Sequence, residues 1–346
     1  MGMKMMIMAV GLMLTVVCAA QKQYKISSVG FYNLENLFDY EDDPLINDEE
    51  YTPSGSKLWT KEMYESKSQR MAEVIAQLSV ELNPDGVAIL GVAEIENKRV
   101  LEDLVKQPKL AARNYQIVHY DSPDRRGIDV GLLYQPKYFQ VTGSRPIPLL
   151  IYEADSSRIF TRDILYVSGV HDNEPLHILV NHWPSRRGGE QTTRALREAG
   201  AAVCKSVVDS LTALDPNVKV IIMGDLNDDP VNASVRKVLQ CEREKEAVEV
   251  GKLYNPMENY FRRGIGTLAY NDAWNLFDQI ILSPGLVKGT SGYTFYKSHI
   301  FNEPFLVQKS GQFKGYPLRT HAGDNYLGGY SDHFPVYVFL VKEQAQ

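Results

Sequence analysis

The sequence predicts an α/β fold built as one large domain. Short apolar runs bounded by turn residues alternate with amphipathic stretches, a pattern typical of strands alternating with helices. No repeat, low-complexity tract or linker divides residues 21–346. A chain of 346 residues with 44% hydrophobic residues can build a stable core without disulfide bonds. We therefore expect residues 21–346 to form one domain, within the size of a large α/β sandwich.

The order of elements follows from the apolar runs. A first helical face consists of Met71, Val74, Ile75 and Leu78, and Asn83-Pro84 should end that helix. A longer helix is expected after Gly189, with a buried face consisting of Leu196, Val203, Val207 and Leu211. Strands are expected at 27–32, 87–93, 130–134, 164–170, 177–180, 218–223, 278–282 and 335–340. The stretches 39–60 and 288–330 lack periodicity, so we expect long loops that carry specificity.

The first twenty residues are typical of a secretory signal peptide. Lys4 precedes an apolar run from Met5 to Val17, and Cys18-Ala19-Ala20 supplies small residues at the cleavage spacing. We therefore expect a secreted or periplasmic protein without a transmembrane segment in the mature chain. A lipoprotein acylated at Cys18 is the alternative, although Val17 is bulkier than lipoprotein signals normally allow.

Only Cys204 and Cys241 remain after this segment. Their spacing does not suit a metal site, and whether they pair is left open by the sequence. Each is expected to be a small buried residue in a helix. The net charge of −6 argues against a protein that coats nucleic acid by charge alone. It does not exclude an enzyme that binds a few phosphates around a metal ion.

Polar side chains follow several predicted core strands at the point where each strand ends. Asn33 and Glu94 follow two of them, and His182, Asp225 and Asn227 follow two more. Strand ends in packed α/β folds gather at one rim and direct polar groups at a common cleft. Carboxylate and amide oxygens suit Mg²⁺, which keeps most of its water and bridges to phosphate. This set therefore favours hydrolysis of a phosphate ester.

Other hydrolytic chemistries lack their motifs. The sequence has no His-Glu-x-x-His and no cysteine cluster, which argues against zinc. It also lacks the Gly-x-x-x-x-Gly-Lys-Ser/Thr loop of nucleotide triphosphatases and the Gly-x-Ser-x-Gly turn of serine hydrolases. Phosphoryl chemistry here would need a water nucleophile, a proton acceptor and groups that hold the developing charge.

Six short motifs follow one another along the chain: Phe31-Tyr32-Asn33-Leu34-Glu35, Gly91-Val92-Ala93-Glu94, Asn181-His182-Trp183-Pro184-Ser185, Gly224-Asp225-Leu226-Asn227, Phe277-Asp278-Gln279-Ile280 and Ser331-Asp332-His333. In order and rough spacing they resemble the motifs of the endonuclease/exonuclease/phosphatase superfamily, which includes DNase I. The resemblance covers residues 25 to about 342, and Gly-Asp-x-Asn followed by a C-terminal Ser-Asp-His is its most specific part. It implies a four-layer α-β-β-α sandwich of two facing mixed sheets between outer helices, with the active site at one rim.

The resemblance also implies a role for each motif residue. Glu94 would be the principal ligand of Mg²⁺, or of Mn²⁺ or Ca²⁺ in its place, with Asn33 nearby and Asp332 helping through metal-bound water. Asp225 and Asn227 would align the attacking water and the phosphate. His333, oriented by Asp278, would be a general base or a phosphate contact, and Asp225 is the other candidate base. His182 would hold the phosphate or protonate the leaving oxygen.

Positive side chains form a second group of candidates. Arg162 resembles a phosphate-contacting arginine of the DNase I branch, and Arg126 and the pair Arg186-Arg187 also flank predicted strand ends. The planar guanidinium binds phosphate oxygens in a bidentate fork. Asp129 is a candidate for orienting His182.

The fold does not fix the substrate. The stretches 126–134 and 181–189 look like those of secreted or membrane-associated bacterial nucleases. DNA or RNA is therefore the expected substrate, and no stable protein partner is expected. A sphingomyelinase-like or other small phosphate ester hydrolase is the alternative, and a non-catalytic binding module is a third hypothesis. A nuclease would present an open groove with arginines, whereas a lipid hydrolase would present an exposed apolar hairpin or wedge.

Overall fold

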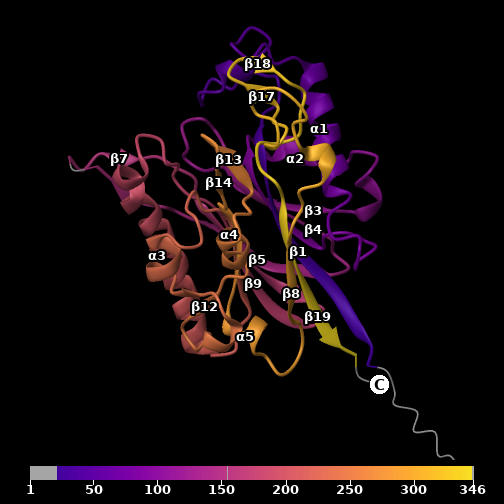
Figure 1. Ribbon diagram of the computed structural model, residues 1–346, viewed down its shortest axis with the longest axis vertical. Helices are drawn as coiled ribbons and strands as arrows, with labels where there is room; N and C mark the ends of the chain where they lie inside the picture. The colour runs from indigo at the N-terminus through magenta and orange to yellow at the C-terminus, as the bar shows by residue number, and fades with distance from the viewer. Residues whose placement is uncertain (1–21, 154, 345–346) are drawn as a thin grey trace, which may run out of the picture.

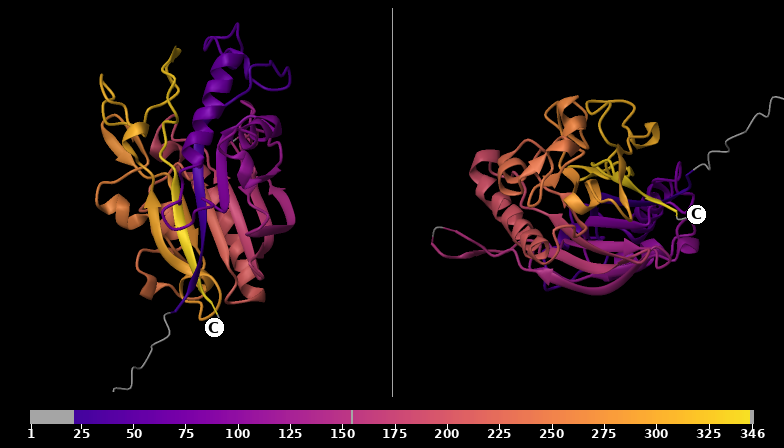
Figure 2. Two further views of the ribbon diagram at one scale, coloured as in Figure 1. Left: turned by 90° about the vertical axis from the view of Figure 1, so that its right-hand side faces the viewer. Right: turned by 90° about the horizontal axis from the view of Figure 1, so that it is seen from below.

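Two facing β-sheets with helices on their outer sides form the protein (Figures 1 and 2). The computed structural model describes residues 22–153 and 155–344, so the expected signal peptide at 1–20 lies outside the described residues. This arrangement confirms the predicted α-β-β-α sandwich. No helix in the described ranges is long and apolar enough to cross a membrane.

The first sheet has six strands, and its central pair is parallel. β1 (Tyr24–Leu37) runs parallel to β2 (Ile89–Ile95) and antiparallel to β19 (Val336–Glu343) on its other side. The full order is β16 (Thr294–Ile300), β19, β1, β2, β4 (Asp129–Tyr134) and β3 (Gln116–His119).

The second sheet has seven strands and is also mixed. β9 (Glu174–His182) and β10 (Val220–Asp225) are parallel, and β15 (Asp278–Leu282) is antiparallel to β10. The full order is β11 (Cys241–Glu242), β12 (Leu253–Tyr254), β15, β10, β9, β8 (Ile164–His171) and β5 (Phe139–Ile147).

Helices lie outside the two sheets. α1 (Lys61–Ile75) and α2 (Lys98–Val105) lie against the first sheet, and α3 (Glu190–Leu214) packs on the outer face of the second. The shorter elements are α4 (Glu258–Arg262), α5 (Pro284–Val287), a π-helical turn at Ser234–Val238, and 3₁₀ turns at Glu49–Tyr51, Ala111–Arg113, Lys245–Ala247 and Pro304–Leu306. Three hairpins extend from the body: β6 (Ile151–Tyr152) with β7 (Arg158–Ile159), β13 (Leu268–Tyr270) with β14 (Ala273–Asn275), and β17 (His321–Ala322) with β18 (Asn325–Tyr326).

The two sheets pack closely at their centres because of one glycine. A Cβ atom added at Gly91 would lie 2.8 Å from the Met223 sulfur of the facing sheet and 3.1 Å from a Val180 methyl group. The missing side chain lets β2 approach β9 and β10. This approach brings the ends of strands from both sheets to one rim.

Several local predictions needed correction. α1 ends at Ile75, well before Asn83, and Leu78 is buried in the turns that follow. The buried face of α3 does not centre on the predicted residues Leu196, Val203, Val207 and Leu211 but on the stripe of residues beside them. Small side chains on that stripe let the helix lie close to Trp183. Residues 288–330 are not entirely loop, since they contain β16. The residues at the centre of the α3 face are Arg197, Gly200, Ala201, Cys204 and Val208.

The two cysteines are unpaired and buried. Cys204 lies in α3 as expected, but Cys241 begins the short strand β11, so its predicted helical setting was wrong. Burial raises the pKa of both thiols, which keeps them in the protonated, unreactive form.

Candidate active site

The register of the second sheet places three of the predicted residues in one row. His182 ends β9 and pairs with Asp225 at the end of β10. Asp225 in turn pairs with Asp278 at the start of the antiparallel strand β15. The row therefore follows directly from the strand pairing.

The first sheet delivers the remaining residues to the same rim. Asn33 pairs with Ala93, and Glu94 follows in β2 at the register shift before the next pair, Leu37 with Ile95. Because β19 runs antiparallel to β1, the residues that precede it, Asp332 and His333, come to this end as well.

The backbone at the rim adopts conformations that most residues avoid. Glu94 and Asn227 have φ of +58° and +48°, in the left-handed region. Gly224 has φ +157°, and a Cβ atom there would lie 2.2 Å from the Asn181 carbonyl oxygen. The glycine of the Gly-Asp-x-Asn motif is therefore required by the close approach of β9. Such outliers cluster at sites where geometry is imposed by function.

Asn33 connects the two sheets at the centre of the site. It is fully buried, and its Nδ2 donates to Glu94 Oε1 at 3.2 Å and to Asp225 Oδ2 at 3.1 Å. Its Oδ1 accepts the Glu35 N–H at 2.9 Å, which sets the orientation of the amide. In this arrangement Asn33 holds two carboxylates together, and its direct ligation of a metal stays a prediction.

His333 lies between two aspartates. Its Nδ1 is 2.7 Å from Asp278 Oδ2, and its Nε2 is 3.9 Å from Asp225 Oδ2. Burial opposes protonation of the ring, but the neighbouring carboxylates outweigh it and raise the His333 pKa well above its ordinary value. The predicted pairing of Asp278 with the histidine is thus present in the geometry.

Asp225 is buried, and its Oδ2 atom faces His333. Burial raises its pKa to about 7, opposed chiefly by the positive charge of His333. Its Oδ1 accepts the Asn227 N–H at 2.9 Å, and Asn227 Nδ2 donates to the Trp183 carbonyl at the same distance. The Asp225–Asn227 turn is therefore rigid.

His182 faces the carboxylates with its Nε2 atom. That nitrogen is 3.8 Å from Glu94 Oε1 and 3.7 Å from Asp225 Oδ2. Burial, reinforced by nearby positive charge, holds its pKa well below the ordinary value. Its Nδ1 is buried without a hydrogen-bond partner among the described residues.

The prediction that Asp129 orients His182 was wrong. Asp129 Oδ2 instead lies 3.0 Å from His119 Nε2, and its Oδ1 accepts the Ser122 N–H at 2.9 Å. The side chain of Asp129 therefore points to the β3–β4 connection, since His119 ends β3 and Ser122 lies in the loop that follows it.

The two candidate arginines have different surroundings. Arg162 is 6% exposed and donates from Nε to the His182 carbonyl, from one terminal nitrogen to Asp124 and from the other to the Trp183 carbonyl. It supports the loop that carries His182, and contact with phosphate stays a prediction for it. The Arg126 side chain is half exposed, and its closest carboxylate contact is Asp124 at 3.7 Å. The positive charge of Arg126 helps to lower the pKa of both His182 and Arg162, so Arg126 lies near the rim. Its half-exposed guanidinium group is available to a ligand.

Two further arginines lie near the rim. Arg186 is bound to Asp228, Asp229 and Glu190, which gives it a structural setting. Arg319 lies 3.3 Å from Asp332 Oδ2 and is about one third exposed. No motif marks Arg319 in the sequence, and only its position in an irregular segment before Ser331 could have drawn attention to it.

The residues fit a divalent cation. Ligand atoms of Glu94, His182 and Asp225 lie within 4.8 Å of one another, and those of Asp225, Asp278 and His333 form a second such group. Asp332 Oδ1 lies 4.0 Å from His333 Nε2 at the edge of these groups. Two of the three ligand residues in each group are carboxylates, and this predominance of oxygen suits a hard cation such as Mg²⁺.

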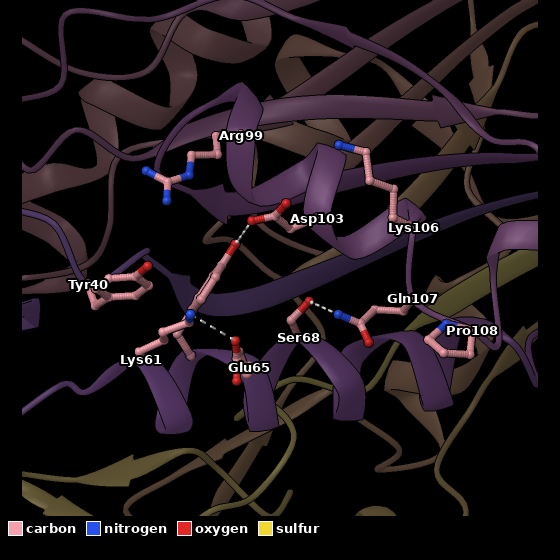
Figure 3. Close-up of a pocket in the computed structure, with 10 residues that line it drawn as sticks. Tyr40, Lys61, Glu65, Ser68, Arg99, Asp103, Lys106, Gln107 and Pro108 are labelled. Atoms are coloured by element: carbon pink, nitrogen blue, oxygen red, sulfur yellow. Dashed lines mark hydrogen bonds and ion pairs between the residues drawn. The ribbon is translucent and has the colours of Figure 1, made fainter.

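A pocket of about 390 Å³ between α1 and α2 is a poor alternative site (Figure 3). Two of its three cations are already paired, since Arg99 binds Glu41 and Lys61 approaches Glu65 at 3.8 Å. Tyr64 also donates to Asp103. The pocket lies on the outer helices and contains none of the residues at the strand ends.

The fold and the rim agree with sequence comparison. The family described as "Endonuclease/Exonuclease/phosphatase family" matches residues 28–342. The chain belongs to the endonuclease/exonuclease/phosphatase family. No curated protein matches the sequence.

Solved structures of this family share the fold at low identity. An endonuclease/exonuclease/phosphatase family protein from Bacteroides thetaiotaomicron is 16% identical, with a TM-score of 0.56 over 93% of this chain and 100% of that one. A mannosyl-6-phosphatase from the same organism is 16% identical, with a TM-score of 0.54 over 91% and 99%. TDP2 from D. rerio, complexed with a single-strand DNA product, is 14% identical, with a TM-score of 0.53 over 91% and 98%.

Membership of the endonuclease/exonuclease/phosphatase family supports a phosphoric ester hydrolase that depends on a divalent metal. Eight motif residues were predicted from the sequence to be catalytic or metal-binding, and all of them lie at one rim of this fold. They are Asn33, Glu94, His182, Asp225, Asn227, Asp278, Asp332 and His333. The identity of the ion and of the ester does not follow from membership.

Proposed function

We propose that this protein is a secreted, Mg²⁺-dependent phosphodiesterase that hydrolyses nucleic acid by an activated water. Mn²⁺ or Ca²⁺ could occupy the same ligands. The observation that carries the proposal is the joined set of Asn33, Glu94 and Asp225, with His182 and His333 on either side.

The side chains divide the reaction among them. Glu94 would hold the cation, which neutralises phosphate charge and polarises the ester. Asp225 and His333 are the two candidate acceptors of the water proton, and Asp278 keeps His333 Nε2 directed into the site. His182 would hold a phosphate oxygen through Nε2 or protonate the leaving oxygen. Asn227 keeps the Asp225 carboxylate in place.

Charge and aromatic surface beside the rim support a nucleic-acid substrate. Arg125 and Arg158 both lie over the half-exposed Phe160 ring, at 5.6 and 5.1 Å from its centroid. Trp274 is 36% exposed and stacks at 6.0 Å on Phe334, the residue after His333. Arginines with exposed aromatic rings are typical of surfaces that bind single-stranded nucleic acid by phosphate contact and base stacking. The similar TDP2 structure holds a single-strand DNA product.

A lipid or other small phosphate ester is the second candidate substrate. Leu45 and Leu58, in the irregular segment 39–60, are 89% and 61% exposed. The mannosyl-6-phosphatase with the same fold illustrates how far substrates vary among such structures. A non-catalytic binding module is the weakest candidate, because all eight motif residues are present at one rim.

Secretion is part of the proposal and rests on the sequence of residues 1–20 alone, with acylation of Cys18 as the alternative. Mass spectrometry of the protein exported by bacterial cells distinguishes an N-terminus created by cleavage from a lipid-modified Cys18. An uncleaved chain retained in the cytoplasm would contradict both.

The deciding experiment is hydrolysis of plasmid DNA, RNA and sphingomyelin by residues 21–346, with Mg²⁺ or EDTA, beside His333→Ala. Metal-dependent cleavage of DNA or RNA that the variant lacks is the expected result. Turnover of sphingomyelin alone would move the substrate to the lipid class. Absence of turnover on all three would contradict the proposed substrate and direct attention to small phosphate monoesters.

A further inference from the structure

A lysine side chain of α1 is buried beside the rim. Lys67 is 1% exposed, although burial of an ammonium group is unfavourable unless the group is paired and hydrogen-bonded. Its Nζ donates to Thr320 Oγ1 and, at 3.4 Å, to the Tyr330 carbonyl. Both acceptors belong to the segment 318–333, which includes the β17–β18 hairpin at the top of Figure 1. The buried amine therefore holds a segment more than 250 residues further along the chain.

Glu35 binds the same segment from the other side. Its side chain is buried, and its two carboxylate oxygens accept the N–H groups of Thr320 at 2.7 Å and His321 at 3.4 Å. Burial lowers the pKa of Lys67, and Glu35 is the largest of the carboxylates that oppose this effect. Burial raises the pKa of Glu35 to about 7, opposed chiefly by the charge of Lys67. Lys67 and Glu35 are thus two buried ionisable side chains whose hydrogen bonds converge on Thr320.

This segment leads directly to the catalytic residues. Tyr330 N donates to the Leu318 carbonyl at 2.6 Å, which closes the base of the segment. Ser331 Oγ then donates to the Asn33 carbonyl at 2.7 Å and accepts the His333 N–H at 3.1 Å. The segment reaches Asp332 and His333 within three residues of the Lys67 contact at Tyr330.

The backbone at Glu35 is held in an unfavourable conformation. Glu35 and Asn36 have φ of +48° and +51°, in the left-handed region that L-residues seldom adopt. The turn places the Glu35 carboxylate against Thr320 and at the same time directs the Asn36 N–H to Glu94 Oε2 at 3.0 Å. One turn therefore connects the principal metal-ligand candidate with the segment that carries His333.

We propose that Lys67 and Glu35 form a positioning pair that fixes residues 318–333 and so places Asp332 and His333 for hydrolysis. This inference rests on the proposed function, because the reaction in which Asp332 and His333 take part is the hydrolysis proposed there. Neither residue of the pair touches the substrate. The pair acts through Thr320 and Tyr330 on the position of the residues that follow them.

The first test is hydrogen–deuterium exchange of residues 21–346, comparing the Lys67→Met variant with the wild type. We expect faster exchange in peptides from 318–333 and unchanged exchange in β2 and β10. Lys61→Met, an exposed lysine on the same helix, is the matched control and should leave 318–333 unchanged. Unchanged exchange in 318–333, or an equal increase across both sheets, would overturn the proposal. This readout does not depend on activity, so it stands apart from failure of the proposed function.

The second test measures kcat and KM with bis(p-nitrophenyl) phosphate and Mg²⁺. Misplacement of a catalytic group by about 1 Å costs on the order of 100-fold, so Lys67→Met should lower kcat by at least about tenfold with little change in KM. Val208→Ala in the buried face of α3 supplies a variant destabilised far from the segment. Equal losses of kcat in the two variants, or wild-type kcat in Lys67→Met, would overturn the positioning role.

Thr320→Val keeps the test possible if Lys67→Met does not fold. This variant removes the hydroxyl that accepts from Lys67 but retains the backbone N–H that Glu35 binds. We expect a smaller loss of kcat than in Lys67→Met, and faster hydrogen exchange that is confined to residues 318–333. Wild-type exchange and wild-type kcat together in Thr320→Val would contradict the proposal.

Discussion

His333 holds Asp278 through Nδ1 at 2.7 Å while its Nε2 lies 3.9 Å from Asp225. The first contact fixes the ring, and the second directs the remaining nitrogen at the centre of the rim. A histidine held in this way can take or give a proton at a single defined atom. The same three residues therefore form a unit whose members can be tested one at a time.

Asp278→Asn should lower kcat by on the order of 10²- to 10⁴-fold, because the amide no longer favours the same ring orientation and charge of His333. The His333 pKa should fall, since Asp278 is the largest of the carboxylates that raise it. NMR titration of the ring together with the pH profile of kcat checks both expectations. A variant with wild-type kcat would contradict the orienting role of Asp278.

Glu94→Gln should remove stabilisation by Mg²⁺. A metal ion that binds only the folded state raises the free energy of unfolding by about 2.7 kcal/mol when its concentration is a hundred times its Kd. Thermal unfolding with and without Mg²⁺ should show a shift for the wild type and none for the variant. Glu41→Gln, an exposed carboxylate outside the rim, should keep the full shift. An equal shift in Glu94→Gln would exclude Glu94 as the principal ligand.

Arg126→Ala should affect substrate binding, whereas Arg162→Ala should affect the stability of the fold. Loss of the half-exposed Arg126 should raise KM several-fold and change stability by less than about 0.5 kcal/mol. Loss of Arg162 leaves the buried Asp124 without its partner, which typically costs about 3–5 kcal/mol. Denaturant unfolding and steady-state kinetics on the same preparations separate the two effects. A raised KM without loss of stability in Arg162→Ala would show instead that Arg162 contacts the substrate.

Trp274→Ala should discriminate between substrate classes. Stacking on an aromatic ring is worth about 1–3 kcal/mol per base, so KM for a single-stranded oligonucleotide should rise on the order of tenfold. KM for bis(p-nitrophenyl) phosphate, which carries no base, should change much less. Equal changes for both substrates would argue against base stacking on this ring.

His171 should make the protein sensitive to acid. It is buried, its Nε2 is 2.8 Å from Ser27 Oγ, and burial lowers its pKa from 6.5 to about 4. Because the unfolded chain takes up the proton first, this stability is present above about pH 6.5 and is lost as pH falls toward 4. The loss is on the order of 3 kcal/mol for a shift of this size. His171→Gln should flatten the dependence of unfolding free energy on pH in this window, and an unchanged slope would contradict the assignment.

The sequence was most informative where chemistry depends on strand ends. Apolar runs located the core strands, and the polar residue after each run located the rim, since strand register then places His182, Asp225 and Asp278 in a row. Contacts between distant segments left no such pattern. Asp129 is adjacent in sequence to a candidate strand end but bonds to His119, and Lys67 occupies an ordinary helical position whose partner is Thr320. The α3 face shifted because small residues, which hydrophobic periodicity underweights, allow the closest packing.

Gly91 allows the two sheets to meet, and the site is divided between them, with Asn33 and Glu94 on one and His182, Asp225 and Asp278 on the other. Neither sheet alone could carry out the reaction. Hydrolytic capacity would therefore arise only when both halves have folded and docked, and a proteolytic fragment that retained a single sheet would be inert. The cell that makes such a protein would be shielded from unintended hydrolysis by incomplete chains.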